Sequence, residues 1–454
     1  MLMLYALLIY AVIGTIIAIF AKRKVSTDED YYIGGRNVSG IVSALTYAAT
    51  TYSAFMMVGL VGLTYLSGVG ALGFELFYLV GTLLLLSYYA PKIWRMGKEK
   101  GLITPGDLVA SRYGELTAKI MAIVVAIALI PYTSIQFVGI SFLLGNAMSF
   151  EAGVVLSAII IALWALLGGL RSVAWTDAVF GLFMLSMAII AVFYAFSMFP
   201  STPEFSKLGE LMYVPNSFWT PLTFISFTLP WFFFALTNPQ VLQRLFIPKD
   251  EKSLRRMVIL FGVFGFIYTI LVTLLGLILR LLEKEGIFPL VKNRDLVTPT
   301  FLNMIPEWLS IAIGLSIFAA AITTANSIVL TLSSMFSRDL LKNRSVLAGR
   351  LFVVAITSAV AIFAIQKPAY IVDLAVMSST ILLCQLPLFL GIFHYNIGGR
   401  ISANVTLIAG FSTAIVMLYT KATFGIPVSV WVLLISFTAF FLTAILEKRF
   451  KVQN

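Results

Sequence analysis

Two adjacent threonines in an apolar stretch give the first chemical signal. In the segment GLSIFAAAITTANSIVLTLSS, Ala320, Thr323 and Thr324 share one face of a helix, because residues three and four apart are neighbours there. Two hydroxyls then lie near one backbone carbonyl. Neutral oxygens suit a hard cation such as sodium, and not zinc or copper. The alternatives are hydroxyls bonded only to carbonyls of their own helix, or a seam where two helices pack.

Two further apolar stretches contain residues that interrupt a helix. The segment SALTYAATTYSAFMMVGLVG places Thr51 and Ser53 among small residues, and it could unwind and free its carbonyls. Unwound backbone within a lipid bilayer is tolerated only where it lines a site. The segment FTLPWFFFALTNPQVLQR carries Pro230 and Pro239 within a single apolar run. Both stretches are therefore expected to contribute to a buried site.

Few reactive or ionisable side chains lie in the apolar stretches. Glu75 and Asp177 are functional candidates because a carboxylate in lipid is costly. The single cysteine, Cys384, excludes an internal disulfide, and the single histidine, His394, excludes His-cluster zinc chemistry. The chain shows no nucleophile, metal or cofactor constellation. We therefore expect no enzyme activity and no cofactor other than a coupling ion.

The composition indicates that lipid surrounds most of the chain. Of 454 residues, 60% are apolar and 11% charged, which leaves too few polar side chains to cover a water-facing surface. A spanning helix needs about 20 apolar residues, and the short alternation typical of barrel strands is absent. We expect an all-α polytopic membrane protein. Its thirteen spans are expected near residues 3 to 21, 39 to 64, 71 to 90, 118 to 146, 150 to 168, 173 to 199, 219 to 240, 257 to 282, 304 to 334, 346 to 366, 369 to 393, 402 to 420 and 427 to 446.

The basic residues predict the orientation in the membrane. Lys22, Arg23 and Lys24 follow the first span, and the positive-inside rule places them in the cytoplasm. With alternating spans, 24 of the 31 Lys and Arg residues fall inside. The N-terminus is then expected outside and the C-terminus inside the cytoplasmic membrane. The net charge of +11 thus reflects topology and does not indicate a nucleic-acid partner.

A series of collinear motifs resembles the sodium/solute symporter family. The block WALLGGLRSVAWTDAVFG resembles its signature, a pair of glycines followed by Trp-Thr-Asp. Further matches are YYIGGRNVSG, LITPGDLVASRYG, NPQVLQRLFIPKDEKSLRR and FAAAITTANSIVLTLSSMFSRDLL. The order of matches from about residue 28 to 345 is more specific than any single motif. The last hundred residues match only weakly.

The resemblance implies a five-plus-five inverted repeat of the leucine-transporter type. The interrupted second and seventh spans would be the first helices of the two repeats, with the sites beside them at the midplane. The expected segments are 1–37, an accessory helix and loop; 38–199, the first repeat; 200–218, an outer loop; 219–395, the second repeat; and 396–454, two accessory spans.

The resemblance also implies an ion site. The family's sodium ligands fall on the carbonyls of Ala49, Tyr52 and Ala320 and the hydroxyls of Thr323 and Thr324. Relatives usually have Ser-Ser or Ser-Thr at the last two positions, so both oxygens are kept.

Asp177 matches the Asp of the Trp-Thr-Asp block, which in relatives lies near the inner ion pathway. A helix cap beside Arg171 is the alternative for this carboxylate.

The solute residues are carried over in the same way. Trp231 and Tyr132 match positions near the solute in proline-type relatives, and Gln136 lies one turn from Tyr132. Glu75 lies where galactose-type relatives bind sugar hydroxyls. Packing or interface anchoring is the alternative for the aromatic residues. Thr51 and Ser53 lie in the expected unwound stretch, although many proline-type relatives have Asp where this chain has Thr51.

These observations predict a sodium-coupled symporter for a small polar organic solute, working by alternating access. An amino acid such as proline is favoured over a sugar or a monocarboxylate. The expected partners are the solute, the sodium ion and the lipid bilayer, with no obligate protein partner. A non-transporting membrane sensor on the same fold and a proton-coupled permease are the alternatives. The five expected ion ligands include no titratable group, which favours sodium over the proton.

Overall fold

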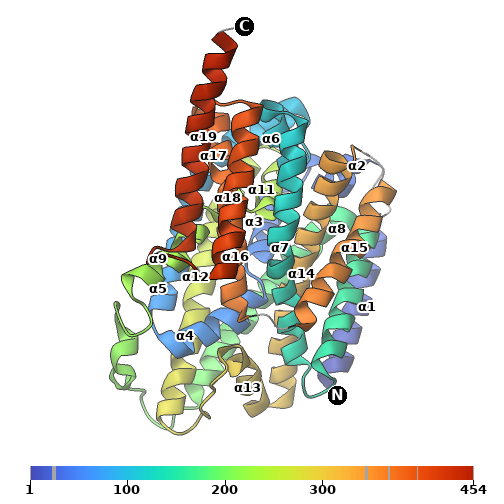
Figure 1. The fold of residues 1–454 in the computed structure, drawn as a ribbon. Helices are drawn as coiled ribbons and strands as arrows, with labels where there is room; N and C mark the ends of the chain where they lie inside the picture. The colour runs from blue at the N-terminus through green and yellow to red at the C-terminus, as the bar shows by residue number, and fades with distance from the viewer. Residues whose placement is uncertain (1, 23–26, 343–345, 367–368, 396, 453–454) are drawn as a thin grey trace.

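The computed structural model describes residues 2–22, 27–342, 346–366, 369–395 and 397–452. These residues form helices and connecting loops, and their only β feature is an isolated bridge between Val38 and Pro248. The long helices run side by side in one bundle, and short helices cover its ends (Figure 1). This arrangement agrees with the predicted all-α fold class.

The helices follow one another along the chain with short connections. They are α1 (Leu2–Lys22), α2 (Asp28–Ile33), α3 (Gly40–Thr51), α4 (Val61–Ser67), α5 (Gly70–Lys100), α6 (Pro105–Tyr113), α7 (Glu115–Leu143), α8 (Phe150–Ser197), α9 (Pro221–Phe232), α10 (Phe234–Thr237), α11 (Pro239–Gln243), α12 (Glu251–Lys284), α13 (Val297–Met304), α14 (Glu307–Ser334), α15 (Val346–Ile365), α16 (Ile371–Leu382), α17 (Leu386–His394), α18 (Arg400–Thr420) and α19 (Val428–Val452).

The predicted second span is broken. It consists of α3, a short break that begins with Tyr52 in extended backbone, the π-helical turn η2 (Phe55–Leu60) and α4, and the two halves are bent by 50°. Small and hydroxyl-bearing residues at the break favour this, because their side chains satisfy backbone groups that the helix no longer pairs. The predicted seventh span is also divided, into α9, α10 and α11, with Pro239 at the start of α11. The prediction that these two spans are interrupted is confirmed.

The predicted fifth and sixth spans are two helices that meet at a kink with no loop between them. Helix α8 has 48 residues and kinks at Gly169, whose φ of 58° and ψ of −172° fit glycine best. In the described residues, nine helices are long and apolar enough to cross a membrane, or ten with the bent pair α3 and α4. The count of thirteen spans and the segment boundaries remain predictions.

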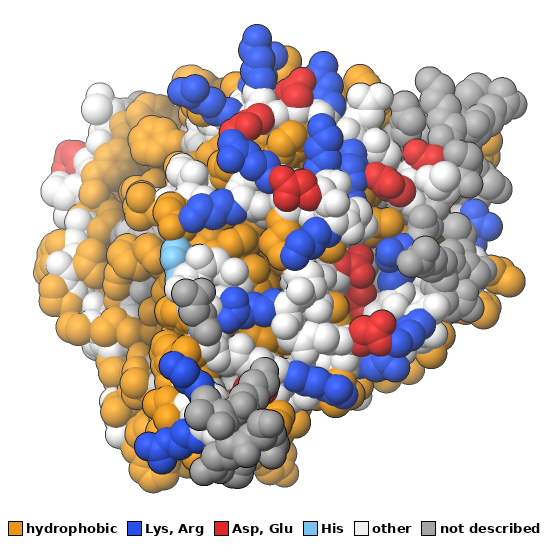
Figure 2. All heavy atoms as spheres, turned by 90° about the horizontal axis from the view of Figure 1, so that it is seen from above, with side chains coloured by type: hydrophobic (Ala, Val, Ile, Leu, Met, Phe, Trp, Pro, Cys, Tyr) orange, Lys and Arg blue, Asp and Glu red, His pale blue; other side chains and the backbone are white. Residues whose placement is uncertain are grey.

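The two ends of the bundle differ in charge. Helix α1 begins at one end and α19 finishes at the other (Figure 1). Seen from the end where α19 finishes, the surface carries many Lys and Arg side chains among fewer Asp and Glu (Figure 2). We call this the basic end. Arg23 and Lys24 lie outside the described residues.

Candidate ion and solute site

The site begins where α3 stops. Tyr52 is the C-cap of this helix, with an extended backbone (φ −89°, ψ 96°), and its N–H still donates to the carbonyl of Ala48 at 2.7 Å. Beyond this point the regular i to i−4 ladder ends. The carbonyl of Ala49 accepts its hydrogen bonds from side chains of α14. The break therefore turns a backbone acceptor toward a neighbouring helix.

Helix α14 supplies the two predicted hydroxyls. Thr324 Oγ1 donates to the carbonyl of Ala49 at 2.8 Å, and Thr323 Oγ1 lies 3.3 Å from the same oxygen. Thr323 Oγ1 also lies 3.1 Å from the carbonyl of Ala320. All four residues are buried. Four of the five predicted ion ligands thus form one cluster of neutral oxygens, and Tyr52 lies next to it at the end of α3.

A second layer of polar side chains extends this cluster. Ser327 Oγ lies 3.0 Å from Thr50 Oγ1 and accepts a hydrogen bond of 2.5 Å from Arg244 Nη2. Arg244 is fully buried. The sequence prediction did not include these residues. Ser327 was recognisable, because it lies four residues after Thr323 and therefore on the same helix face.

Asp177 lies in the interior of α8 and is fully buried. Its Oδ2 accepts a hydrogen bond of 2.5 Å from Thr46 Oγ1 on α3, and it interacts electrostatically with Arg244. The carboxylate therefore faces α3, on the side of the oxygen cluster nearer the start of that helix. The side chain of Arg171, named in the alternative, lies outside the described residues.

Two of the predicted solute residues, Gln136 and Ser53, hold the break in place, whereas Thr51 bonds within α3. Gln136 Oε1 on α7 accepts a hydrogen bond of 3.2 Å from the N–H of Ala54. Ser53 Oγ accepts from the N–H of Phe55 at 3.1 Å. Thr51 Oγ1 donates to the carbonyl of Tyr47, one turn earlier, at 2.8 Å. The Gln136 and Ser53 side chains thus satisfy backbone donors that the unwound segment leaves without a helical partner.

Trp231 lies in an aromatic stack beside the break. Its ring stacks between those of Phe55 and Phe234, at centroid distances of 4.9 and 5.1 Å. Tyr78 meets it edge-on at 5.2 Å. Tyr132 lies 6.4 Å from Phe234, so the two predicted aromatic residues share a neighbour. Trp231 and Tyr132 are each 1% exposed, which closes this part of the site to solvent.

Glu75 on α5 is fully buried, and neither carboxylate oxygen has a hydrogen-bond partner in the described part of the chain. It interacts electrostatically with Tyr52, Tyr78 and Tyr132. An unpaired buried carboxylate is costly unless a ligand or a proton satisfies it. Glu75 is therefore the group of the site that most needs a ligand or a proton as its partner.

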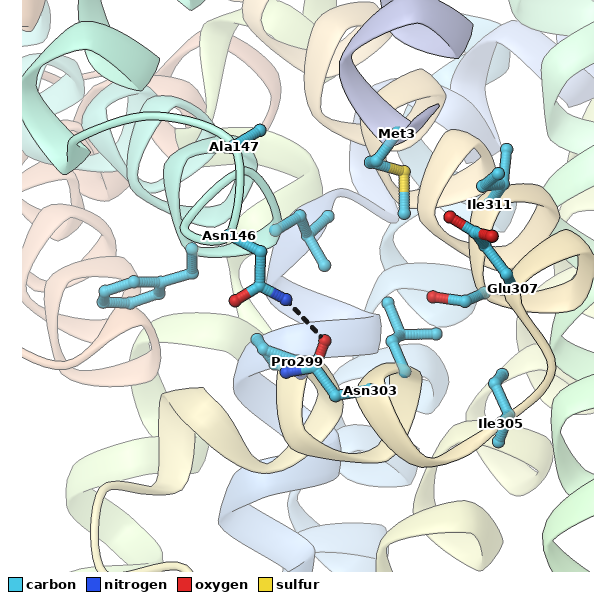
Figure 3. A pocket seen from close by; sticks show the side chains of 12 residues that line it. Met3, Asn146, Ala147, Pro299, Asn303, Ile305, Glu307 and Ile311 are labelled. Atoms are coloured by element: carbon cyan, nitrogen blue, oxygen red, sulfur yellow. Dashed lines mark hydrogen bonds between the residues drawn. The ribbon is translucent and has the colours of Figure 1, made fainter. Parts of the chain in front are cut away.

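A separate cavity of about 230 Å³ lies at the end of the bundle opposite to the basic end. It is bounded by the start of α1, the end of α7, α13 and the start of α14, and a hydrogen bond of 2.8 Å joins Asn146 to Asn303 across it (Figure 3). None of its lining residues belongs to the predicted ion or solute set. The predicted residues instead converge on the closed region around the break in α3.

Residues 31–397 match the sequence profile of the sodium:solute symporter family. This chain therefore belongs to the sodium:solute symporter family, as the motifs predicted. It is 26% identical over 267 residues to the sodium/pantothenate symporter of Escherichia coli (strain K12), covering 56% of this chain. It is 24% identical over 386 residues to the osmoregulated proline transporter OpuE of Bacillus subtilis (strain 168), covering 81% of this chain and 78% of that protein.

The coverage of the relatives is uneven. The chain spans about half of two of them, 55% of the pantothenate symporter and 51% of the uncharacterized symporter YwcA of Bacillus subtilis (strain 168). Among solved structures, a Na⁺-coupled sialic acid symporter superposes with a TM-score of 0.83 at 17% identity, over 98% of both chains. This likeness confirms the predicted fold class of the leucine-transporter type.

Proposed function

We propose that this protein is a secondary active transporter that couples sodium entry to the uptake of a small polar organic solute by alternating access. The observation that carries the proposal is the bond from Thr324 on α14 to the free carbonyl of Ala49 at the break in α3. It places neutral oxygens from two helices, far apart in sequence, at one buried point. The repeats 38–199 and 219–395 would each supply part of this site.

Sodium binding requires a small rearrangement of the hydroxyl protons. Each threonine must turn its proton away from Ala49 so that its oxygen lone pairs face the ion. Thr323 already has two acceptors for this proton in its own helix, the carbonyls of Ala319 at 2.9 Å and Ala320 at 3.1 Å. The ion would then replace the hydroxyl protons as the link between α3 and α14.

The solute site we propose lies on the other side of the break, between Glu75, Tyr132 and Trp231. An amino acid such as proline suits it, because its cationic nitrogen can pair with the Glu75 carboxylate and its ring can lie against aromatic side chains. Relatives named for pantothenate and proline support a small carboxylate-bearing solute of this kind. A sugar or a monocarboxylate is the alternative, with Glu75 accepting hydroxyl hydrogens.

The orientation we propose places the basic end in the cytoplasm and the start of α1 outside, following the positive-inside rule. The membrane would then be the cytoplasmic membrane. Asp177 and Arg244 would line the inner side of the ion site, since both lie between the oxygen cluster and the basic end.

Uptake by proteoliposomes tests the proposal. Purified protein is reconstituted, and labelled proline, galactose and pantothenate are offered under an inward sodium gradient, an inward proton gradient or no gradient. Accumulation of one solute under the sodium gradient alone is expected. Equal accumulation under a proton gradient in sodium-free buffer would contradict sodium coupling and favour Glu75 as a proton carrier. Solute binding without accumulation under any gradient would favour the sensor alternative.

A further inference from the structure

A second binding groove lies on the side of the bundle near its basic end. Helices α5 and α12 touch where the side chain of Leu83 packs over Gly262, and a Cβ at Gly262 would lie 3.1 Å from that leucine. From this contact toward the basic end the helices enclose a groove of about 640 Å³. The exposed ion pair between Arg95 and Glu251, at 2.7 Å, ties the helices together again at the far end of the groove. The groove is therefore bounded at both ends.

The lining of the groove changes in character along its length. Leu86, Ala90, Leu254 and Val258 give it an apolar wall, all of them buried or half-buried. Glu251, Lys252 and Arg255 line it toward the basic end, and all three are exposed. The charge of Glu251 is paired with Arg95, which leaves the two basic side chains for an anion. The described part of the chain gives neither of these two an ion-pair partner. The groove thus joins an apolar half to an anion-binding half.

The backbone adds a hydrogen-bond acceptor. Pro91 lies inside α5 and has no N–H, so the carbonyl of Ser87, one turn earlier, does not receive its usual helical hydrogen bond. Ser87 and Pro91 both line the groove. A ligand hydroxyl can satisfy this carbonyl.

We propose that this groove binds an anionic phospholipid with a hydroxylated headgroup, such as phosphatidylglycerol. The phosphate lies between Lys252 and Arg255, a headgroup hydroxyl donates to the Ser87 carbonyl, and an acyl chain follows the apolar wall toward Leu83. Basic pockets between transmembrane helices at the cytoplasmic surface bind anionic headgroups in this manner. The charge of the groove selects this occupant over a zwitterionic lipid or an uncharged helix.

A second groove provides a comparison within the same molecule. It lies at the opposite end of the bundle, measures about 390 Å³, and is lined by apolar and hydroxyl-bearing residues with Asp373 and without Lys or Arg. Its one charged lining residue is acidic, so a phosphate gains nothing there. The difference in charge predicts that anionic lipid occupies only the groove between α5 and α12.

Native mass spectrometry of the purified full-length protein tests the proposal. The protein is titrated with phosphatidylglycerol, with phosphatidylcholine of the same acyl chains, and with inorganic phosphate. One phosphatidylglycerol is expected to bind more tightly than phosphatidylcholine, and phosphate alone is expected not to bind. The double variant K252A/R255A is expected to lower the affinity for phosphatidylglycerol about thirtyfold, because each basic side chain near an anionic surface contributes a factor of about five to the affinity.

Two further variants separate the groove from charge in general. Lys448 and Arg449 are exposed on α19 outside the groove, so K448A/R449A removes the same charge and is expected to leave binding unchanged. Ser87→Trp fills the groove and keeps both basic residues, and it is expected to abolish the bound lipid. The proposal is overturned if phosphatidylcholine binds as tightly as phosphatidylglycerol, or if inorganic phosphate binds as tightly as the lipid. It is also overturned if K448A/R449A loses as much affinity for phosphatidylglycerol as K252A/R255A does, or if Ser87→Trp binds phosphatidylglycerol like the wild type.

Discussion

The hydroxyl of Thr324 donates to the carbonyl of Ala49 across 2.8 Å and 275 positions of sequence, and this bond joins α14 to the broken end of α3. Its partners are a side chain that can turn and a carbonyl that the helix break has freed. Anything that competes for this carbonyl, a cation above all, acts on both helices at once.

Replacing Thr324 with Ala removes one proposed sodium ligand and one of the hydroxyls that meet at Ala49. We expect the sodium concentration for half-maximal uptake to rise at least tenfold, with a smaller loss of maximal rate, because a direct ligand is lost. Thr324→Ser keeps the oxygen and is expected to stay close to wild type. Uptake by proteoliposomes over a range of sodium concentrations measures the effect.

A matched control for this substitution is Thr413→Ala. The Thr413 hydroxyl donates to the carbonyl of Ala409 within α18, at 2.8 Å, and takes no part in the ion cluster. Its removal should leave the sodium dependence unchanged. A Thr324→Ala protein with unaltered sodium dependence would remove this residue from the ion site.

Gly265 on α12 forms the notch that receives the Tyr52 hydroxyl. A Cβ at this position would lie 2.2 Å from that oxygen, so Gly265→Ala must displace the tyrosine that caps α3. We expect weaker sodium and solute binding and a lower unfolding temperature. Adding Tyr52→Phe removes the clashing oxygen and should recover part of the lost binding affinity and stability.

Gly73→Ala on α5 is the control for this substitution. Its Cβ would meet Phe224 at 3.5 Å, an ordinary contact, and alanine is the better helix former. Binding and stability should therefore be kept. Equal damage by both substitutions would show that the Tyr52 notch has no special role.

The sequence predicted the site where the relevant contacts follow from helical spacing. Thr323 and Thr324 were found because they share a face with Ala320, and the break in α3 was expected from its small and hydroxyl-bearing residues. Arg244 was missed because it lies just beyond the predicted end of the seventh span.

Contacts between distant segments were harder to predict. The bond from Ala54 to Gln136 joins residues 82 positions apart, and no local pattern indicates such a pair. Thr51, which was predicted to face the solute, instead bonds through its hydroxyl to a carbonyl of its own helix. Periodicity gives the face of a helix, whereas the neighbour of that face is decided by packing.

Asp295 is expected to make stability depend on pH. It lies in the short helix η5 (Arg294–Leu296), outside the spanning helices, and its Oδ2 accepts from the N–H of Ile371 at 3.0 Å. Burial raises its pKa to about 6, although this hydrogen bond and Arg294 lower it. The folded state therefore binds the proton more tightly than the unfolded state does. The stability that this proton gives the folded state is lost as the pH rises from about 4 to about 6.

The variant Asp295→Asn separates this group from the other acids. It keeps an acceptor for Ile371 and removes the titration, so it should be more stable than wild type by roughly 3 kcal/mol above pH 7 and similar to wild type near pH 4. Thermal unfolding of both proteins between these values measures the difference. A constant difference at every pH would exclude Asp295 as its source.

The orientation can be measured without altering the native cysteine. Cys384 is buried, so a new exposed cysteine can be labelled selectively. We expect Lys207→Cys to react with an impermeant maleimide added to intact cells, and Lys448→Cys to react only after the membrane is opened, because the positive-inside rule places the latter in the cytoplasm. Reaction of both in intact cells would contradict the odd number of spans, seven, predicted between these two positions.

The last prediction concerns the coupling of ion and solute. The unwound segment between Tyr52 and Ala54 lies between the two proposed sites, and the same short stretch of backbone is fixed by Gln136 on one side and follows Ala49 on the other. Sodium bound at Ala49 should order this segment and so raise the affinity for solute. Linkage requires bound solute to raise the affinity for sodium by the same factor, and coupling free energies of about 1 to 3 kcal/mol are typical.

Substitutions should divide according to the site that they touch. Thr323→Ala is expected to weaken binding of both ligands, because the ion orders the shared segment. Glu75→Gln and Trp231→Phe are expected to lower the affinity for solute. The affinity for sodium, measured in the absence of solute, should stay nearly unchanged, since neither residue contacts the oxygen cluster. Gln136→Leu leaves the N–H of Ala54 unpaired in a buried segment, at a cost of about 1 to 3 kcal/mol, and should reduce the coupling itself.

Calorimetric titration of each ligand in the presence and absence of the other measures these quantities directly. Equal coupling factors in the two directions are required of any equilibrium, and their size in wild type is the informative value. If sodium and solute bind independently in wild type, the unwound segment does not link the sites, and transport would need another source of coupling. If Gln136→Leu keeps the full coupling while both affinities fall, the segment links the sites without the help of α7.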